Sequence, residues 1–457
     1  MGSYDDFQVK INKTVIVRPS PLLSENGVLP LSNIDRKCPM FMYSVHFYEA
    51  KLNFDTNFFN TLRSSLEITL HVWYPAAGRL TVSPINGKLD LLCNNGGALM
   101  VEAKTEVEIS QLGELTQYKP FYEKLVHKPG FNGGFSDMPL VVVQVTWFRC
   151  GGYSIGVGAS HSLFDGKGFF NFLRSWALRA SSNEVSEQLM PVHERGYLLI
   201  HQGSKLGKNG VFRVPAFDHL HHLIELASAC GDSERKTGRC RFSEMDFIAM
   251  EDNYAFKTFR LSKEIVESLK RKVSNRGPLS GFSTFEVVAA HLWKVRSKSL
   301  GLRGENKVCL QFSMDARAKV VPPLSTEFSG NAYVMASIFT TAKALEEEPI
   351  STTAYKIREA KESITDEYIR AYLIALDAPQ KSLPPLPELT IVSDLRNLPF
   401  HCADFGHGHA ASAALLPSPL PQSAFLMRAP NEEGAIDVSL GLPLQIANAF
   451  SHCFLHV

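Results

Sequence analysis

The sequence predicts an α/β (α+β) protein built from two domains. Strand patterns and helix patterns alternate in both halves of the chain, which excludes an all-helical protein. The chain has 457 residues, 45% of them hydrophobic, so it can supply two hydrophobic cores. We expect an N-terminal domain over residues 1–200, a crossover linker over 201–250, where Gly, Ser and charged residues interrupt the apolar pattern, and a C-terminal domain over 251–457.

A β-hairpin followed by a helix is predicted in the middle of the chain. The strand Leu140–Phe148 is apolar and β-branched, Gly151–Gly152 is a turn pair, and Tyr153–Ser160 is the returning strand. Apolar residues at helical spacing then predict a helix over Phe169–Ala177. The hairpin therefore delivers His161 to the end of a strand.

Two glycines in the returning strand, Gly156 and Gly158, remove side chains from the approach to His161. Glycine in a strand often marks a place where a ligand comes close to the backbone. We therefore expect His161 to be a catalytic base at the mouth of a channel.

The second half of the chain resumes the alternating pattern. Tyr254–Leu261 predicts a strand, and Ser262–Lys270 predicts a helix that begins with a capping serine. Ser283–Trp293 predicts another helix with a capping hydroxyl and an acidic residue in its first turn. Val308–Asp315 completes the pattern as a strand.

Charge and cysteine usage exclude several classes of partner. Formal charge is +1, with 47 basic and 46 acidic residues, which gives no field to hold nucleic acid or an anionic membrane. No apolar run reaches the length of a membrane span, and the N-terminus shows no export signal. The 8 cysteines are scattered without a C-x-x-C pair, which is typical of reduced thiols in a cytoplasmic protein.

Two short motifs carry the chemistry, His161–Gly166 and Asp404–Gly408. A neutral imidazole can accept a proton and return it near neutral pH, so His161 is a candidate general base. A lone histidine is more often a satisfied core residue, and the hairpin around this one favours catalysis. The imidazole and thiol groups over His401–His409 match no standard zinc spacing, so we expect no metal.

The sequence resembles the plant BAHD family of acyl-CoA-dependent acyltransferases along nearly its whole length. The similarity begins with the two motifs above. Within the family, three stretches are most similar to the branch associated with brassinosteroid inactivation: Leu31–Phe47, Trp73–Leu80 and Gly151–Gly166. Softer matches follow in order along the chain at Leu31–Asp35, Trp73–Leu80, Ala290–Trp293, Asp315–Arg317, Phe328–Ala332 and Arg396–Phe400.

The resemblance implies a fold of two similar domains, each like chloramphenicol acetyltransferase, with a solvent channel between them and the histidine at its centre. It also implies a reaction without an acyl-enzyme. His161 would deprotonate an acceptor hydroxyl or amine, which attacks the thioester carbonyl of acyl-CoA and expels the CoA thiolate. Acyl-CoA would be a co-substrate, and no cofactor would be bound permanently.

Supporting roles around the histidine follow from the resemblance. Asp165 would turn away from the substrate and pair with Arg317, so that this ion pair shapes the site. Family members often use a hydroxyl and a tryptophan to stabilise the intermediate. Here Ser393 offers the hydroxyl, while Leu395 stands where the tryptophan is expected.

The resemblance also implies coenzyme A contacts at Arg260 and Ser262, at a strand-to-helix junction where a basic group and a helix N-terminus could meet phosphate. The second motif is structural in the family. We therefore expect Asp404, Gly406 and Gly408 to have a role in folding. The motif also has His407 where the family usually has tryptophan.

The sequence thus predicts a monomeric acyl-CoA-dependent O-acyltransferase acting on a small hydroxylated plant metabolite. The acceptor would be a brassinosteroid or, alternatively, a hydroxycinnamoyl-type or other specialised metabolite. A catalytically idle relative that binds a ligand or partner is the other class, and the intact His161, Asp165 and Arg317 favour the enzyme. Donor and acceptor identity depend on channel-lining side chains that motifs do not reveal.

Overall fold

The computed structural model describes residues 7–37, 40–50, 57–130, 136–181, 190–200, 213–234, 254–274, 281–378, 386–417, 420–430 and 432–457. The chain divides into two compact units. Unit 1 consists of Met1–Ser204, Pro323–Ala332 and Leu398–Leu416, and unit 2 consists of Lys205–Pro322, Tyr333–Asn397 and Pro417–Val457. Two short segments from late in the chain therefore belong to the same unit as His161.

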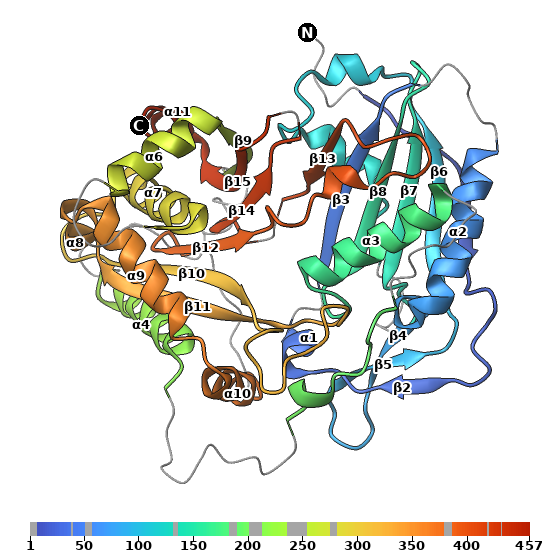
Figure 1. Cartoon of the computed structure of the whole chain (residues 1–457), viewed down its shortest axis with the longest axis horizontal. Coiled ribbons are helices and arrows are strands. Elements are labelled where there is room, and N and C mark those ends of the chain that lie inside the picture. Colours follow the sequence, from blue (N-terminus) through green and yellow to red (C-terminus); the bar gives the residue numbers. More distant parts are fainter. Residues whose placement is uncertain are drawn as a thin grey trace. The chain divides into compact units, whose positions relative to one another are not determined.

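The main sheet of unit 1 contains, among the described residues, six strands in the order β1-β6-β7-β8-β3-β13 (Figure 1). β6 and β7 are parallel, and the other neighbours are antiparallel. Every residue of β8 is buried, as expected for a central strand covered on both faces. The strands are β1 (Lys10–Val17), β3 (Phe41–Tyr48), β6 (Ala98–Lys104), β7 (Val141–Trp147), β8 (Tyr153–Ser160) and β13 (Ser412–Leu415).

A smaller sheet and several helices complete unit 1. The small sheet pairs its strands in the order β2-β5-β4. Helices α2 and α3 pack against each other beside the main sheet (Figure 1). The bounds are β2 (Gly27–Leu29), β4 (Arg79–Val82), β5 (Leu89–Cys93), α1 (Asn33–Lys37), α2 (Phe58–Val72), α3 (Gly166–Ser181), and the 3-10 helices Tyr74–Ala77, Ile109–Leu112, Pro120–Leu125, Gly196–Leu198 and Phe400–Cys402.

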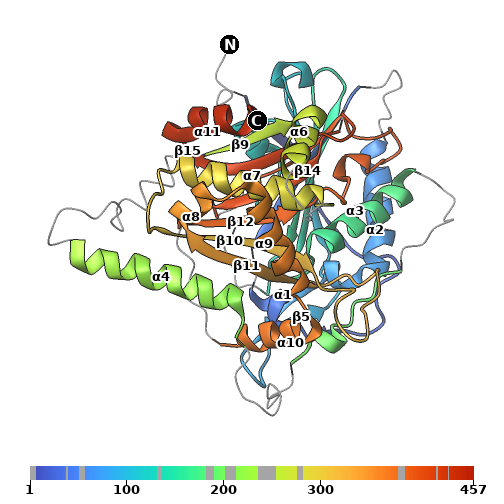
Figure 2. The ribbon, with the colours of Figure 1, turned by 60° about the vertical axis from the view of Figure 1, so that its left-hand side comes forward.

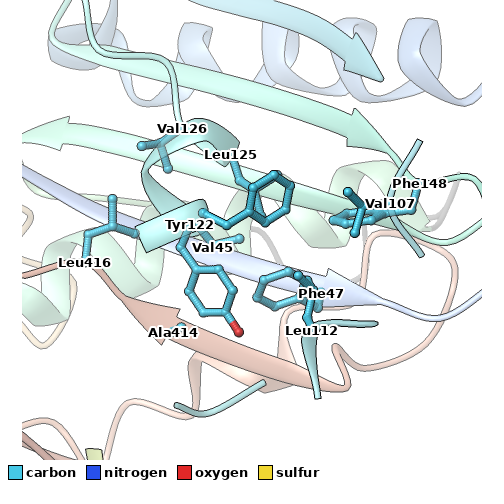
Figure 3. Packing of buried hydrophobic residues seen from close by; sticks show 11 residues of the cluster. Val45, Phe47, Val107, Leu112, Tyr122, Leu125, Val126, Phe148, Ala414 and Leu416 are labelled. Atoms are coloured by element: carbon cyan, nitrogen blue, oxygen red, sulfur yellow. The ribbon is translucent and has the colours of Figure 1, made fainter. Parts of the chain in front are cut away.

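One face of the main sheet of unit 1 is covered by the 3-10 helix Pro120–Leu125 (Figure 3). Val45 and Phe47 of β3 point into this layer, where the rings of Phe47 and Tyr122 have centroids 5.0 Å apart. Ala414 of β13 belongs to the same buried cluster. A strand from late in the chain thus shares a hydrophobic core with strands from its first third.

The main sheet of unit 2 contains, within the part of the chain that the structure describes, six strands in the order β11-β10-β12-β14-β15-β9. β12 is parallel to both β10 and β14, and the remaining neighbours are antiparallel. The strands are β9 (Tyr254–Leu261), β10 (Lys307–Asp315), β11 (Tyr333–Thr341), β12 (Leu389–Asp394), β14 (Ser423–Arg428) and β15 (Ile436–Pro443).

Helices cover both faces of the unit 2 sheet (Figure 2). On one face the Gln311 amide of β10 donates to the Ala216 carbonyl of α4 at 2.7 Å. On the other face the next residue, Phe312, meets Phe285 of α7 with ring centroids 5.2 Å apart. The helices are α4 (Pro215–Glu234), α6 (Lys263–Ser274), α7 (Thr284–Ser299), α8 (Ala342–Glu347), α9 (Ile350–Glu362), α10 (Asp366–Ala375) and α11 (Ala447–Leu455), with a 3-10 helix at Leu444–Ile446.

The predicted start of α7 is confirmed at atomic detail. The Ser283 hydroxyl accepts the backbone N–H of Glu286 at 3.3 Å, and the Glu286 carboxylate accepts the backbone N–H of Ser283 at 2.9 Å. This reciprocal pair satisfies two backbone N–H groups at the helix start that have no acceptor within the helix.

The two units repeat one arrangement of four strands. In unit 1, β7 and β8 form an antiparallel pair, with β3 antiparallel to β8 and β6 parallel to β7. In unit 2, β14 and β15 form the same pair, with β9 antiparallel to β15 and β12 parallel to β14. The predicted α/β class with two similar domains is confirmed, although the sequence itself shows no repeat.

The predicted domain ranges are continuous, whereas unit 1 includes two segments of the predicted C-terminal domain, 251–457. Within the predicted linker, 201–250, Pro215–Glu234 forms α4, which packs on β10 and β11. Linker residues 201–212 and 235–250 lie outside the described residues. The boundaries of the three ranges stay a prediction.

No helix among the described residues is long and apolar enough to cross a membrane. Among the described residues, five cysteines form no disulfide: Cys93, Cys150, Cys309, Cys402 and Cys453.

Candidate active site

His161 directly follows β8, at the end of the predicted hairpin. Its backbone N–H donates to the Met40 carbonyl oxygen at 2.7 Å, and the N–H of Ser160 donates to the Leu140 carbonyl at 2.8 Å. The His161 side chain is half-buried. The strand end therefore fixes the backbone of the histidine while leaving part of its side chain accessible.

The two glycines of β8 have a different purpose from the one the sequence suggested. A Cβ on Gly156 would lie 2.1 Å from the Leu125 carbonyl oxygen, and a Cβ on Gly158 would lie 2.5 Å from the Tyr43 ring. Both distances are far below van der Waals contact. Close packing inside unit 1 accounts for these glycines, so they do not indicate a path for a ligand.

The turn after β8 is held by side chains from distant parts of the chain. The Asn331 amide nitrogen donates to the His161 carbonyl oxygen at 2.7 Å. The Arg195 guanidinium donates to the Leu163 carbonyl oxygen at 3.3 Å. Two carbonyls of the turn after β8 are thus hydrogen-bonded to buried side chains.

Asp165 turns both carboxylate oxygens toward backbone N–H groups of unit 1. One oxygen accepts the N–H of Gly168 at 2.9 Å and so caps the first turn of α3, and the other accepts the N–H of Ala332 at 3.1 Å. A Cβ on Gly168 would lie 2.3 Å from the Ser329 carbonyl oxygen, so only glycine lets these segments meet. Asp165 thereby ties the turn after β8 to the segment before β11.

Arg317, the expected partner of Asp165, lies just after β10 in unit 2. Its guanidinium donates to the Asp315 carboxylate at 3.1 Å, and its side chain is 4% exposed. Since Asp165 and Arg317 belong to different units, their pairing stays a prediction.

Ser393 lies near the end of β12 and is half-buried. The neighbouring Asp394 receives two hydrogen bonds from the guanidinium of Arg396, at 2.7 and 2.6 Å. This bidentate pair fixes the backbone that follows Ser393. A contact between Ser393 and a reaction intermediate stays a prediction.

Arg260 and Ser262, the residues expected at coenzyme A, already have partners in unit 2. Arg260 of β9 makes two hydrogen bonds to the carboxylate of Asp437, at 2.8 and 3.0 Å. The Ser262 hydroxyl donates to the Glu264 carboxylate at 2.6 Å. A phosphate at this position would have to compete with carboxylates for both donors, and the role stays a prediction.

The second motif forms a tight loop around a single carboxylate oxygen. Asp404 accepts the N–H groups of Gly406 and Gly408, each at 2.8 Å. Gly406 has φ of +99° and Gly408 has φ of +88°, a region that side chains with a Cβ rarely adopt. Geometry thus gives each of the three predicted residues a local structural task.

The family assignment rests on the whole chain. The model of the Transferase family matches residues 7–456. The chain belongs to the Transferase (BAHD) family.

Two curated relatives illustrate the range of this BAHD protein's similarities. Brassinosteroid-related acyltransferase 1 of Arabidopsis thaliana is 43% identical over 447 residues, which cover 94% of this chain and 93% of the relative. Omega-hydroxypalmitate O-feruloyl transferase of Arabidopsis thaliana is 26% identical over 460 residues, which cover 100% of this chain and 94% of the relative. The chain is therefore an acyltransferase for groups other than aminoacyl groups.

Solved structures share the fold of this BAHD chain. Vinorine synthase has a TM-score of 0.69 at 21% identity, covering 97% of this chain and 96% of its own. TRI101 of F. graminearum, crystallised with coenzyme A and T-2 mycotoxin, has a TM-score of 0.69 at 15% identity, covering 93% of this chain and 96% of its own.

His407, where the family resemblance led us to expect a tryptophan, makes aromatic contacts in this BAHD chain. The His407 imidazole stacks on the Phe58 ring with centroids 4.3 Å apart and planes 16° apart. It also meets Tyr153 of β8 edge-on, at 5.5 Å. The neighbouring Phe405 is buried against Trp176 of α3. The loop is thus anchored on aromatic rings of unit 1.

Leu395, at the other altered position, is half-buried and donates only its backbone N–H, to the Leu426 carbonyl at 2.9 Å. It offers no side-chain donor in place of an indole.

A pocket of about 300 Å³ lies among α6, α7, α8 and α11 of unit 2. Its lining includes Lys272, His291, Lys298 and Leu345, and none of the predicted site residues. This pocket is therefore separate from the predicted chemistry.

Within the described ranges, no three His, Cys, Asp or Glu side chains are grouped so as to hold a metal ion.

Sequence reasoning missed three buried residues, Asp35, Arg195 and Asn331. Arg195 and Asn331 hydrogen-bond to carbonyls of the turn after β8, and Asn331 also donates to Asp35. Asp35 and Asn331 lie in segments that the family resemblance had matched, Leu31–Asp35 and Phe328–Ala332, so a signal for both was present. Arg195 had no such signal, because its neighbourhood matches no motif.

Proposed function

We propose that the protein transfers an acyl group from a coenzyme A thioester to a hydroxyl of a small plant metabolite, with His161 as the general base. The observation that carries the proposal is the place of His161 in an acyltransferase of the BAHD family. The residue directly follows a buried central strand, on a turn whose carbonyls are hydrogen-bonded to Asn331 and Arg195.

The proposed reaction proceeds in one addition and one collapse. The His161 imidazole takes the proton of the acceptor hydroxyl while that oxygen attacks the thioester carbonyl. The tetrahedral intermediate then breaks its carbon–sulfur bond, an ester remains on the acceptor, and the imidazolium returns the proton to the CoA thiolate. Such a direct transfer needs no acyl-enzyme.

Three further residues have proposed roles. Asp165 and Arg317 would shape the site as an ion pair, and the Ser393 hydroxyl would donate to the oxyanion of the intermediate. A preorganised donor of this kind is worth about 3 kcal/mol in the transition state. Asp165 already acts as a local tie, because its two oxygens accept backbone N–H groups on either side of the turn.

The proposed donor is acyl-CoA, used as a co-substrate rather than a permanent cofactor. The crystal structure of TRI101 with coenzyme A shows that a protein of this fold accepts the carrier. Arg260 and Ser262 are the proposed phosphate contacts, although their bonds to Asp437 and Glu264 would have to open.

The proposed acceptor is a brassinosteroid. The 43% identity to Brassinosteroid-related acyltransferase 1 supports this choice over the alternatives. A hydroxycinnamoyl-type transfer to another metabolite is the second candidate, supported by the 26% identity to an O-feruloyl transferase. The protein is further proposed to be a cytoplasmic monomer, which light scattering of the purified protein and imaging of a fluorescent fusion would test.

The proposal is tested by measuring free-thiol release with acetyl, fatty acyl and p-coumaroyl CoA against brassinosteroids and other hydroxylated acceptors. Mass spectrometry of the acceptor then identifies the ester. Acceptor-dependent release with a brassinosteroid supports the proposal and names the donor class. Release only with other acceptors selects the second candidate, and no release with any pair points to the idle, ligand-binding relative.

A further inference from the structure

The segment Phe328–Ala332 comes from late in the chain and belongs to unit 1, where its backbone pairs with the stretch that precedes Arg195. The backbone N–H of Ser329 donates to the Val192 carbonyl at 2.9 Å, and the N–H of Val192 donates to the Glu327 carbonyl at 3.0 Å. The segment is therefore held by backbone pairing before any side chain is considered.

Asn331 is the residue of this segment that reaches the catalytic turn. Its amide nitrogen donates to the Asp35 carboxylate at 2.7 Å and to the His161 carbonyl oxygen at 2.7 Å. Its backbone N–H also donates to Asp35, at 3.1 Å. Two acceptors surround this nitrogen, so the orientation of the buried amide is fixed, because a flipped amide would turn its oxygen toward both of them.

Asp35 is itself fixed by a fully buried ion pair. Its carboxylate accepts the guanidinium of Arg195 at 3.0 Å, and both side chains are 0% exposed. The backbone and hydroxyl of Ser32 add two donors to the same oxygen, at 2.9 and 2.8 Å. The Asp35 carboxylate thus accepts five hydrogen bonds, from Ser32, Arg195 and Asn331.

Arg195 provides a second link from Asp35 to the turn. Its guanidinium also donates to the carbonyls of His193, at 2.6 Å, and Leu163, at 3.3 Å. Asn331 and Arg195 therefore hold the carbonyls of residues 161 and 163, and both are anchored on one carboxylate. We call Asp35, Arg195 and Asn331 the turn clamp.

Stability alone gives a weak reason for the turn clamp. A buried ion pair contributes little net stability, because the cost of removing two charges from water offsets their attraction. Orientation gives a stronger reason, since a base must lie within hydrogen-bond reach of the proton it takes and small displacements are costly in rate. A clamped carbonyl at residue 161 fixes the peptide plane from which the imidazole projects.

We propose that Asn331 is a positioning residue for His161, which it orients for proton transfer through the His161 carbonyl. This proposal rests on the proposed function, in which His161 is the base. Asn331 does not touch substrate in this role, so its loss acts on the chemical step and leaves substrate binding in place.

The test compares Asn331→Ala with Gln144→Ala in the full chain. Gln144 is a matched control because it is also a buried carboxamide in unit 1, 3% exposed, that donates to a backbone carbonyl, that of Lys124 at 2.9 Å. Both variants lose such a hydrogen bond, and only Asn331→Ala removes one from the catalytic turn. Single-turnover rates, KM for donor and acceptor, and melting curves are measured for each.

The expected result is a 10- to 100-fold lower single-turnover rate in Asn331→Ala, with both KM values within about threefold of the wild type. Gln144→Ala is expected to keep a single-turnover rate within about twofold of the wild type, even if its melting temperature falls as much as that of Asn331→Ala. Equal rates in the two variants would overturn the proposal, and so would a change confined to KM. If Asn331→Ala does not fold, Asn331→Ser is measured by the same criteria.

The same experiment separates this proposal from the proposed function. His161→Ala is assayed in parallel. If it retains activity, the proposed function fails, whatever Asn331 does. If it is inactive while Asn331→Ala turns over like Gln144→Ala, the proposed function stands and the positioning role is wrong.

Discussion

Two further histidines of unit 1, His46 and His193, are buried. The Nε2–H of His193 donates to the Val72 carbonyl at 3.0 Å, so in the neutral ring Nδ1 accepts from the Ser329 hydroxyl at 2.8 Å. Burial lowers the pKa of His193 to about 4, and it lowers the pKa of His46 to about 4 as well. Both rings therefore stay neutral near pH 7 and serve the packing of unit 1.

These two histidines predict a specific loss of stability in acid. In the unfolded chain each has a pKa near 6.5, so the unfolded state binds protons that the folded state refuses. Their contribution is complete above pH 6.5 and is lost as pH falls toward 4, at up to about 1.4 kcal/mol per pH unit for each ring. Urea unfolding at several pH values between 7.5 and 5 measures how the free energy of unfolding changes with pH. This free energy should fall less steeply with pH in His193→Gln than in the wild type, and an equal pH dependence in both proteins would contradict the assignment.

A single backbone angle carries the next prediction at this scale. Gly406 has φ of +99°, and a Cβ there would meet nothing closer than 3.6 Å, so the cost of a side chain is conformational. Gly406→Ala should lower the free energy of unfolding by about 1–2 kcal/mol in thermal or urea melts. Gly130→Ala is the control, because its Cβ would meet no atom within 4 Å and its φ is not in the positive region. A Gly406→Ala protein as stable as this control would show that the loop does not need glycine.

At the scale of elements, one buried arginine joins a helix to a strand of unit 2. Arg296 of α7 is 1% exposed and donates from one nitrogen to the carbonyls of Pro387 and Leu389, each at 2.9 Å, and to the Thr390 hydroxyl at 3.0 Å. Burial lowers its pKa to about 10, which still leaves it charged at neutral pH. The start of β12 therefore depends on α7 for its hydrogen bonds.

Arg296→Met should destabilise the protein by about 3 kcal/mol, because three buried acceptors lose their donor. Lys298→Met on the same helix is the control, since Lys298 is 68% exposed in its ion pair with Glu346 and such pairs contribute about 0–1 kcal/mol. Chemical denaturation measures both. Equal midpoints for the two variants would mean that β12 does not depend on Arg296.

Elements with local signals were predictable from the sequence, and those made by distant pairing were not. The strands Tyr153–Ser160 and Tyr254–Leu261 have the predicted bounds, because turn glycines and apolar runs are read within a few residues. β13 pairs with β3, which lies more than 350 residues earlier in the sequence, and the four residues of β13 contain no signal that predicts this partner. The glycines of β8 misled for the same reason, since the atoms they make room for lie elsewhere in the sequence.

At the scale of the whole molecule, the chain builds two units on one strand arrangement and places its candidate base in the first. The motif residues could be recognised in the sequence, because they form short runs, and their roles in the reaction stay a prediction. The turn clamp could not be recognised, because Asp35, Arg195 and Asn331 are polar residues that a sequence would place at the surface. Only the fold brings them together around a buried carboxylate.

The measurement that tests the central claim most directly compares acyl transfer by wild type and His161→Ala, using one active pair of acyl-CoA and acceptor, with the ester product detected by mass spectrometry. Circular dichroism and melting curves confirm that both proteins are folded. The account predicts a fall of about 10²–10⁴-fold in turnover for His161→Ala, the usual contribution of a positioned general base. Turnover within tenfold of the wild type would contradict the account, because the proton would then be taken by another group.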